Sequence, residues 1–466
     1  MKEIINEEFK NIIEKREANL NSLATKSYDE EATSRELDDY PNPYRTPFQR
    51  DRDRIIHSKA FRRLMHKTQV FVKPDSEHIR TRLTHTLEVM QIARSIARAI
   101  GANEDLTETI SLGHDLGHTP FGHIGEKALN KELKKYGLFF KHNVQSYRIV
   151  NYLEKYYKFP DGGLNLTNAV KFGILRHSGE YSNREENVEV FDKEGNIEKI
   201  RFKQTLEEKI VRLADDTAWL NHDWEDGIRS GLLSNSFLGK ELLLKLGATQ
   251  ADRINRMVID VINNFNKTNQ INFSVEIEKL EKELKSKIKN YLWNSDTIKR
   301  YNNEAKSIIL KLFNFFMEHP DKLPDDTKRL RGLYINNKKK TALIIADYIS
   351  GMTDDWCLRN YETYIYSPYN IYKKLIFPDE HEWLTIKKRN ESEEYEINLP
   401  ESMIIDVNTE FIIYDQSVKE LIKNNKIEDL NKHELGECIY KRENFIEIKK
   451  IKVDKIIEEG NILIIK

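Results

Sequence analysis

With 466 residues, of which 39% are hydrophobic, the chain is too long for one ordinary domain and too apolar for wholesale disorder, so we expect one large core and an appendage. The 75 basic and 76 acidic side chains nearly cancel, which excludes a global electrostatic field that would recruit nucleic acid. The two cysteines exclude a disulfide framework and a cysteine-rich zinc cluster.

The N-terminal residues are expected to form a helical and polar extension over 1–44. Residues 1–25 alternate charged and apolar side chains at helical spacing and lack the apolar centre of a signal peptide. Pro41 and Pro43 end a polar stretch and should interrupt a helix. No apolar run is long enough to span a membrane, so we expect a cytoplasmic protein without a membrane partner.

The core, which we place at 45–379, is predicted to be mostly helical. Apolar residues recur there at steps of about three and four residues, which is typical of helices with one buried face. Helices are expected at 83–100, 105–116, 205–227 and 275–320. A strand-like pair, 188–191 and 200–202, flanks a segment that is typical of a hairpin turn.

The pattern changes after Pro378, where short β-prone runs replace the helical spacing. These runs are 383–386, 394–397, 411–414 and 462–465. We predict a small, separate, β-rich C-terminal module of α+β class over 380–466. The expected fold is therefore mainly α, with a helical core and this module attached.

The segment Gly113–Glu126 contains three histidines, an aspartate and a glutamate among four glycines. Histidine and carboxylate side chains bind divalent metals and transfer protons near neutral pH. The density of these residue types predicts a metal-dependent hydrolytic centre.

The candidate metal ligands are drawn from three separate stretches of the chain: His85, His114, Asp115 and Asp215. Two imidazoles and two carboxylates suit manganese, iron, cobalt or, with fewer histidines, magnesium, and they leave coordination positions open for water and substrate. The alternative is that His114 and Asp115 form a buried hydrogen-bonded pair without a metal.

Asp215, Trp219 and Asp223 follow one another at four-residue steps, so they share one face of the helix expected at 205–227. If Asp215 binds a metal, Trp219 and Asp223 point toward the same cavity, whereas Asp216 faces elsewhere. The alternative is a solvated acidic helix, but the apolar residues of this segment make it amphipathic, and a tryptophan is uncommon on a fully wet face.

Six runs of the sequence together carry a family resemblance: Arg45–Leu64, Thr81–Val89, Gly113–Glu126, Lys141–Ser146, Arg212–Trp219 and Asp347–Asp354. They resemble the HD-domain superfamily, and specifically the bacterial deoxyguanosine triphosphate triphosphohydrolase family. The resemblance covers about 40–378 and does not extend to the tail after 380.

This resemblance implies an HD-domain helical core that hydrolyses a deoxynucleoside triphosphate, with dGTP favoured, to deoxynucleoside and tripolyphosphate. It implies a divalent metal, manganese, magnesium or cobalt with iron as a further candidate, held by the four ligands named above. The substrate contacts fall by position on Arg63, His118, Trp219 and Asp223, and the catalytic work on His123, Glu126 and His142. Within these sets, Arg63 and His118 would contact the phosphates and Asp223 the sugar 3′-hydroxyl. Either His123 or His142 would be the general acid, and the choice between them stays open.

Two positions depart from the family. Trp219 stands where the family usually has tyrosine, which removes a hydroxyl contact near the sugar or phosphate. Asp216 stands where some relatives place a basic residue, so that phosphate contact must come from elsewhere. Of the other histidines, His177 either lines the cavity or is structural, and His222 is interpreted as a supporting residue.

Two alternative functions stay open at this point. One is an HD-type phosphohydrolase acting on another nucleotide, and the other is a non-catalytic module that senses nucleotides or single-stranded DNA. From the resemblance we also expect a homo-oligomer, hexamer or tetramer, with an effector nucleotide or single-stranded DNA as further candidate partners.

Overall fold

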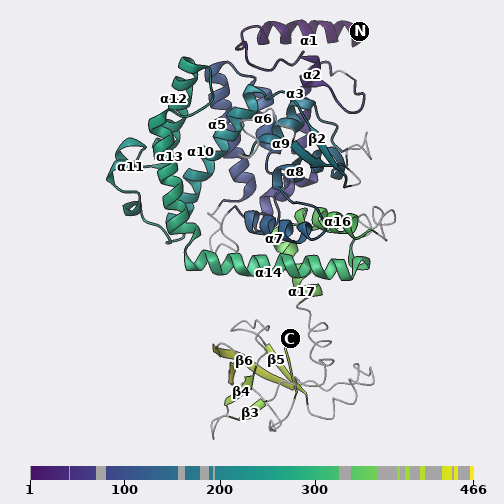
Figure 1. Ribbon diagram of the computed structural model, residues 1–466, viewed down its shortest axis with the longest axis vertical. Coiled ribbons are helices and arrows are strands. Elements are labelled where there is room, and N and C mark those ends of the chain that lie inside the picture. Colours follow the sequence, from purple (N-terminus) through teal and green to yellow (C-terminus); the bar gives the residue numbers. More distant parts are fainter. Residues whose placement is uncertain are drawn as a thin grey trace. The chain divides into compact units, whose positions relative to one another are not determined.

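The computed structural model divides the chain into two compact units, Met1–Leu358 and Arg359–Lys466. The residues that the structure describes are 2–40, 42–69, 80–155, 163–178, 188–192, 195–324 and 337–365, together with strands beyond residue 385. Figure 1 labels the elements of both units.

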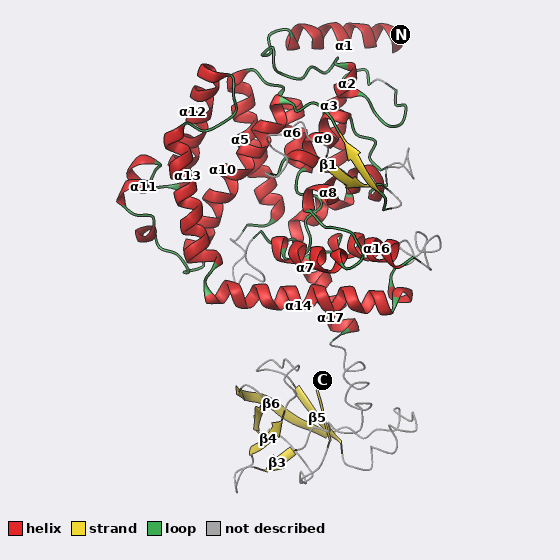
Figure 2. Cartoon of the chain, viewed as in Figure 1, coloured by secondary structure: helices red, strands yellow, loops and turns green. Residues whose placement is uncertain are grey.

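The first unit is built from helices (Figures 1 and 2), which confirms the mainly α fold. Its α-helices are α1 (Lys2–Glu17), α2 (Glu30–Thr33), α3 (Pro47–Ile56), α4 (Lys59–Arg63), α5 (Arg82–Ile100), α6 (Glu104–Gly113), α7 (Gly122–Lys134), α8 (His142–Arg148), α9 (Asn168–Arg176), α10 (Leu206–Arg229), α11 (Lys240–Lys245), α12 (Gln250–Thr268), α13 (Val275–Lys287), α14 (Asp296–Glu318), α16 (Lys338–Ser350) and α17 (Asp354–Tyr364), the last of which continues into the second unit. The shorter helical segments are η1 (Leu64–His66), η2 (Ile149–Leu153), η4 (Asn235–Phe237), η5 (Ile288–Trp293) and η6 (Pro320–Lys322). Across the described part of the chain, no helix is both long and apolar enough to cross a membrane.

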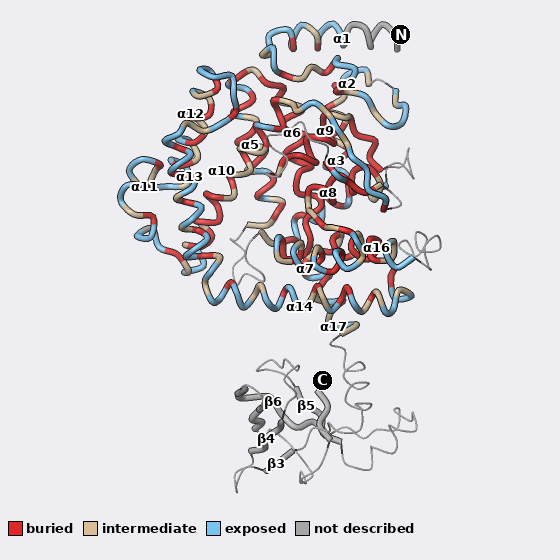
Figure 3. The backbone as a smooth tube through the Cα atoms, in the orientation of Figure 1, coloured by how far each residue is buried: buried red, intermediate tan, exposed pale blue. Residues whose placement is uncertain are grey.

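Helix α5 packs against both α6 and α10, and these three helices hold the centre of the buried core (Figure 3). Thr81 caps the start of α5 by accepting a hydrogen bond from the Thr84 amide, and Gly101, at φ 74°, ends it in the left-handed conformation. Side chains of its apolar stripe, such as Ile96, are fully buried. The helix predicted at 83–100 is therefore confirmed, whereas Leu87, one of the apolar residues whose spacing indicated it, is 43% exposed.

The prediction of one long helix over 275–320 is wrong. The segment instead divides into α13, the π-helical η5 and α14. Ser295 starts the last piece, because its side chain accepts a hydrogen bond from the Ile298 amide as an N-cap does. The two halves also pack on different partners: α13 joins a cluster around Trp224, and α14 lies along α7 and α16.

The expected hairpin is present as β1 (Val188–Phe191) and β2 (Ile197–Ile200), but its second strand was predicted too late, at 200–202. The carboxylate of Asp192 accepts a hydrogen bond from the Asn196 amide at 2.7 Å, so the turn closes earlier than expected. The two strands pair antiparallel with Val188 opposite Ile200.

The N-terminal segment is docked on the helical core and belongs to the same unit. The Thr25 amide donates to the buried carboxylate of Glu207 in α10 at 3.1 Å. Arg35 forms an ion pair of 2.6 Å with Asp51 of α3, whose side chain is completely buried. These contacts tie the residues before α3 to the core, whereas the domain limits expected from the sequence stay a prediction.

The second unit contains a six-stranded sheet in the order β3-β4-β7-β6-β5-β8, with every neighbouring pair antiparallel. Its strands are β3 (Ile386–Lys388), β4 (Glu394–Asn398), β5 (Glu410–Tyr414), β6 (His433–Arg442), β7 (Phe445–Lys449) and β8 (Ile462–Ile465). The β-prone runs at 394–397, 411–414 and 462–465 are therefore confirmed as strands. Residues 383–385 of the first run, and any helix of the predicted α+β module, lie outside the described residues.

Candidate metal centre and active site

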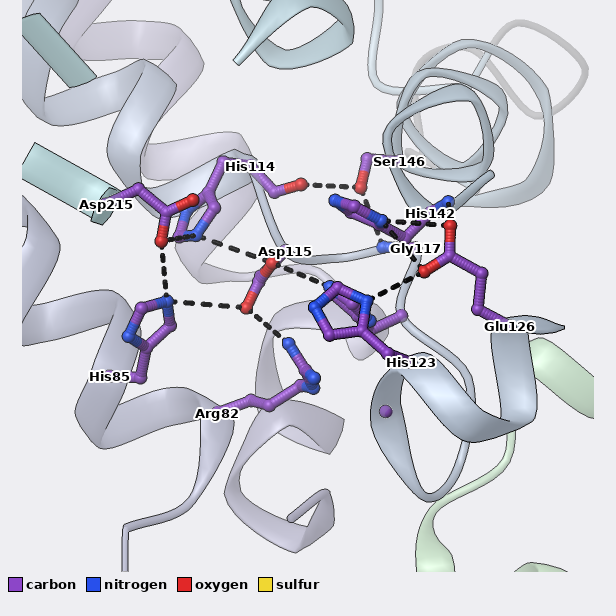
Figure 4. A network of polar contacts seen from close by, with 12 residues as sticks. Arg82, His85, His114, Asp115, Gly117, His123, Glu126, His142, Ser146 and Asp215 are labelled. Carbon is purple, nitrogen blue, oxygen red and sulfur yellow. Dashed lines mark hydrogen bonds and ion pairs between the residues drawn. The ribbon is translucent and has the colours of Figure 1, made fainter. Parts of the chain in front are cut away.

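Three helices bring a metal-binding set of side chains together (Figure 4). His85 comes from α5, His114 from the end of α6 and Asp215 from α10. His85 Nε2 lies 3.1 Å from Asp215 Oδ1, and His114 Nε2 lies 3.9 Å from the same oxygen. One ligand atom of each residue lies within 4.8 Å of the others, a spacing that one cation can bridge.

The fourth predicted ligand, Asp115, lies at the edge of this set. Its carboxylate approaches His114 Nε2 at 3.4 Å and His85 Nε2 at 3.8 Å. Each of its oxygens also has another partner: Arg82 donates to Oδ2 at 2.8 Å, and His118 Nε2 lies 3.2 Å from Oδ1. Asp115 is thus close enough to share in ligation while it connects the metal site to two further basic groups.

The donor atoms of the set are arranged as metal ligands require. The Nδ1 atom of His114 lies 2.6 Å from the Ser111 carbonyl, so this nitrogen carries the proton and Nε2 is left with its lone pair. Among the described residues, no hydrogen-bond partner is found for this fully buried Nε2. His85 is oriented in the same way, because its Nδ1 lies 2.8 Å from His222 Nε2. The residues therefore fit a divalent metal, and His222 has the supporting role expected of it.

Electrostatics keeps both carboxylates of the site ionised. Burial would raise the pKa of Asp115, but the neighbouring His114, His118 and Arg82 side chains hold it well below its usual range. Burial likewise opposes the ionised form of Asp215, but the neighbouring His85 and His114 side chains lower its pKa. An ionised carboxylate is the form that binds a metal.

A second cluster of titratable side chains lies beside the first. The Glu126 carboxylate contacts His123 Nδ1 at 3.0 Å and His142 Nδ1 at 3.1 Å, and it also accepts the His142 amide at 3.0 Å. The rings of His118 and His142 are stacked with centroids 4.0 Å apart. All four residues can place a ligand or proton-carrying atom within 4.8 Å of one another.

The protonation of this cluster is uneven. Burial disfavours a charged His142, but the Glu126 carboxylate outweighs it and raises the pKa of His142 above its usual value. Burial and the charge of Arg82 instead lower the pKa of His118. The His142 side chain is 12% exposed and that of His123 is 65% exposed, so His142 is the sheltered member of the pair on Glu126.

His177, whose role the sequence left open, joins the two clusters. Its Nε2 lies 3.3 Å from His142 Nε2, and its ring centroid lies 5.0 Å from that of His114. The Ile174 carbonyl lies 2.7 Å from its Nδ1, and burial is the main cause that lowers the pKa of His177 to about 3. A neutral His177 can accept a proton in a hydrogen bond from a protonated His142.

Two positions between the end of α6 and the start of α7 favour glycine. Helix α6 ends at Gly113, before the predicted end at 116, and the chain then crosses close to α8. A Cβ on Gly117 would lie 2.2 Å from the His142 carbonyl oxygen, so only glycine permits this approach. Gly122 has a φ of 59° where α7 begins, a conformation that other residues seldom adopt.

Trp219 and Asp223 follow Asp215 along α10. The Trp219 ring is stacked on Trp293 with centroids 5.4 Å apart, and its Nε1 donates to Asp216 at 3.0 Å. This bond follows from helix geometry, because a side chain in a helix leans toward the preceding turn and meets the residue three before it. Asp223 is buried, with Oδ1 3.0 Å from His222 Nδ1.

Arg63, which was predicted to contact the phosphates, lies beside the C-terminal end of α16. It ends α4 and is exposed. Its Nη1 lies beside Gly351, where an added Cβ would come within 3.2 Å of it. Arg82, which sequence reasoning missed as a site residue, is instead buried against Asp115, and the described residues provide no hydrogen-bond partner for its Nη2. The sequence signal for Arg82 was its position immediately before the helix that was expected to carry His85.

Comparisons with known proteins agree with this geometry. The HD domain family matches residues 82–220, and the phosphohydrolase-associated domain family matches residues 271–363. A deoxyguanosinetriphosphate triphosphohydrolase-like protein of Caldanaerobacter subterraneus is 46% identical over 329 residues, which cover 70% of this chain and 87% of that protein. The chain belongs to this HD-domain phosphohydrolase family.

Two further relatives carry the same description. The deoxyguanosinetriphosphate triphosphohydrolase-like protein of Clostridium tetani is 42% identical over 337 residues, covering 71% of this chain and 88% of that protein. The one from Clostridium perfringens is 39% identical over 359 residues, covering 75% and 94%. Family membership makes the chain a hydrolase of the HD type, and its histidine and aspartate cluster can hold a metal ion.

Proposed function

We propose that this protein is a metal-dependent triphosphohydrolase that converts a deoxynucleoside triphosphate, with dGTP favoured, to deoxynucleoside and tripolyphosphate. The observation that carries the proposal is the convergence of His85, His114 and Asp215 on one position beside the cluster of His118, His123, Glu126 and His142. A cation site next to paired acid–base groups suits cleavage at a phosphorus atom. The names of the relatives support the choice of substrate.

His85, His114, Asp215 and the adjoining Asp115 would hold the metal. A bound divalent cation would polarise a phosphoryl oxygen and bring the pKa of a bound water toward neutrality. Manganese, magnesium and cobalt are the candidates, with iron as a fourth, because all accept mixed imidazole and carboxylate donors.

The leaving group needs a proton, since a 5′-alkoxide is a poor leaving group in water. His142 is the better candidate for this general acid, because Glu126 raises its pKa and its side chain is sheltered. Glu126 also holds His123, which is placed to contact the departing sugar or to relay a proton from solvent. A positioned acid of this kind typically contributes about 10² to 10⁴ in rate.

The remaining site residues would bind and orient the substrate. Arg82 has a buried guanidinium group that still offers donors, and His118 lies beside it, so both suit the phosphate chain together with Arg63. Asp223 would accept a hydrogen bond from the sugar 3′-hydroxyl, and the Trp219 ring would lie beside the sugar or base. A homo-oligomer, an effector nucleotide and single-stranded DNA stay predictions from the resemblance.

A panel of the four deoxynucleoside triphosphates with manganese, magnesium or cobalt tests the proposal, with the phosphate product identified by mass. We expect tripolyphosphate in a metal-dependent reaction that His114→Ala and Asp115→Ala abolish. His57→Ala, a change of an exposed histidine at the end of α3, is the matched control and should retain activity. Release of orthophosphate or pyrophosphate alone would instead favour an HD-type hydrolase of another nucleotide class. Tight nucleotide binding without turnover in any metal would favour the sensing module.

A further inference from the structure

The run Asp347–Asp354 matches the family but has no part in the chemistry proposed above. It forms the end of α16, the turn at Gly351 and the first residue of α17. Its contacts nevertheless reach the histidine-rich loop more than two hundred positions earlier in the chain, within the same compact unit. These contacts are hydrogen bonds to backbone groups of the loop, and they converge on one buried carboxylate and one buried ammonium group.

The carboxylate belongs to Asp354, which is 8% exposed. Its Oδ1 accepts the Phe121 amide at 3.0 Å, and its Oδ2 accepts the Thr68 amide at 2.8 Å. Phe121 precedes α7 with a φ of 60°, a left-handed conformation that is unfavourable for a residue other than glycine. It makes no side-chain cap for α7, so the bond to Asp354 is the contact that fixes its amide.

The ammonium group belongs to Lys67, which is also buried. Its Nζ donates to the His118 carbonyl and, at 2.7 Å, to the Ser350 carbonyl at the end of α16. The Lys67 carbonyl accepts the Arg82 amide at 2.9 Å, where α5 begins. The Lys67–Asp354 cluster, meaning Lys67, Thr68, Ser350 and Asp354, therefore joins the loop, α5 and α16.

The loop that precedes α7 is held at this end by the Lys67–Asp354 cluster and by Thr119, whose Oγ1 donates to the Gly122 carbonyl at 2.8 Å. Gly117 is held at the opposite end of the loop by Ser146, whose Oγ accepts its amide at 2.8 Å. Between the two anchors, the His118 carbonyl is fixed by Lys67 and the Phe121 amide by Asp354. Both His123 and Glu126 lie in the first turns of α7, so a rotation at Phe121 would move them together.

We propose that Asp354 is a positioning residue: by holding the Phe121 amide it sets the direction of α7 and hence the place of His123 and Glu126 relative to the substrate. This inference rests on the proposed function for its effect on rate. It does not involve the metal directly, because Asp354 bonds to the Thr68 and Phe121 amides and not to a candidate metal ligand.

Asp354→Asn tests the inference, because the amide keeps the size of the carboxylate but only one acceptor oxygen and no charge. Asp355→Asn is the matched control, since its side chain is exposed. We expect kcat to fall by about tenfold to a hundredfold in Asp354→Asn, as a displacement of catalytic groups does, with KM and manganese affinity close to those of the unchanged protein. Amide hydrogen exchange across 118–126 should become faster in the same variant and not in Asp355→Asn.

Three results would overturn the inference: an unchanged kcat in Asp354→Asn, a loss of manganese affinity as large as the loss of kcat, or unchanged exchange across 118–126. The second result would mean a general loosening of the fold. Failure of the unchanged protein to hydrolyse any deoxynucleoside triphosphate would refute the proposed function instead. The exchange comparison would still decide, in that case, whether Asp354 holds the loop.

Discussion

Replacement of Glu126 by glutamine is the perturbation that most directly examines the proposed acid. The carboxylate lies 3.1 Å from His142 Nδ1 and 3.0 Å from His123 Nδ1, and its side chain is only 16% exposed. Glutamine has nearly the same shape but no charge, so it removes the interaction that favours protonated His142 over the neutral form. Other parts of α7 should be undisturbed.

The sign and size of the effect follow from these contacts. Burial alone would lower the pKa of His142, and Glu126 is what raises it, so in the variant the proton is lost at a lower pH. A hydrogen bond to a charged group contributes about 1.5–3 kcal/mol, which corresponds to roughly 10- to 150-fold in the population of the protonated acid. We expect kcat/KM to fall by about that factor above neutral pH and to recover toward acid pH, with its alkaline limb displaced to lower pH.

The assay is a pH–rate profile of tripolyphosphate release with saturating manganese. Glu132→Gln serves as the control, since Glu132 lies on the same helix but pairs with Lys135 at 2.6 Å, away from the histidines. Manganese affinity should be equal in the unchanged protein and both variants. If Glu126→Gln lowered the rate by one factor at every pH and left the alkaline limb in place, Glu126 would not be the group that retains the proton on His142.

Three further predictions concern the metal, the substrate and the core. His222→Ala removes the group that orients His85, so calorimetric titration should give manganese affinity about 10- to 100-fold weaker, and an affinity equal to that of His57→Ala would contradict the assignment. Trp219→Tyr introduces the tyrosine that the family resemblance leads us to expect there, and competition between deoxynucleoside triphosphates should give altered ratios of kcat/KM. Identical ratios would show that this side chain does not border the substrate. Ile96→Ala opens a cavity in a fully buried position of α5, so urea unfolding should show a loss of about 2–5 kcal/mol, and a loss below about 1 kcal/mol would mean that the site is not packed as described.

Helices of the core were predictable because the information for them is local. The spacing of apolar residues that indicated α5 lies within the sequence of that helix, which ends at Ile100 as predicted. The same locality explains the strands at 394–397 and 411–414, which composition alone indicated. The break at Ser295 was missed because both flanking segments are helical, although the Ser295 N-cap is a local signal and the two segments pack on different partners.

Residue types and spacing were enough to select His85, His114 and Asp215 as candidate metal ligands, because imidazole and carboxylate groups are the side chains that bind divalent metals. Whether they meet is a property of the tertiary structure, because they lie on three helices far apart in the chain. The packing of α5 against α6 and α10 decides it, and the same packing brings His177 and Arg82 to the site.

The amino-acid sequence by itself determined the family, the helical class of the core and the identity of the groups that can hold a metal or carry a proton. Only the tertiary structure decided which of those groups form hydrogen bonds with one another. It also decided which side chains from distant segments form hydrogen bonds to the histidine-rich loop. The physical reason is that hydrogen bonds such as those of Glu126 and Asp354 depend on atomic distances of about 3 Å, which contacts between remote segments establish.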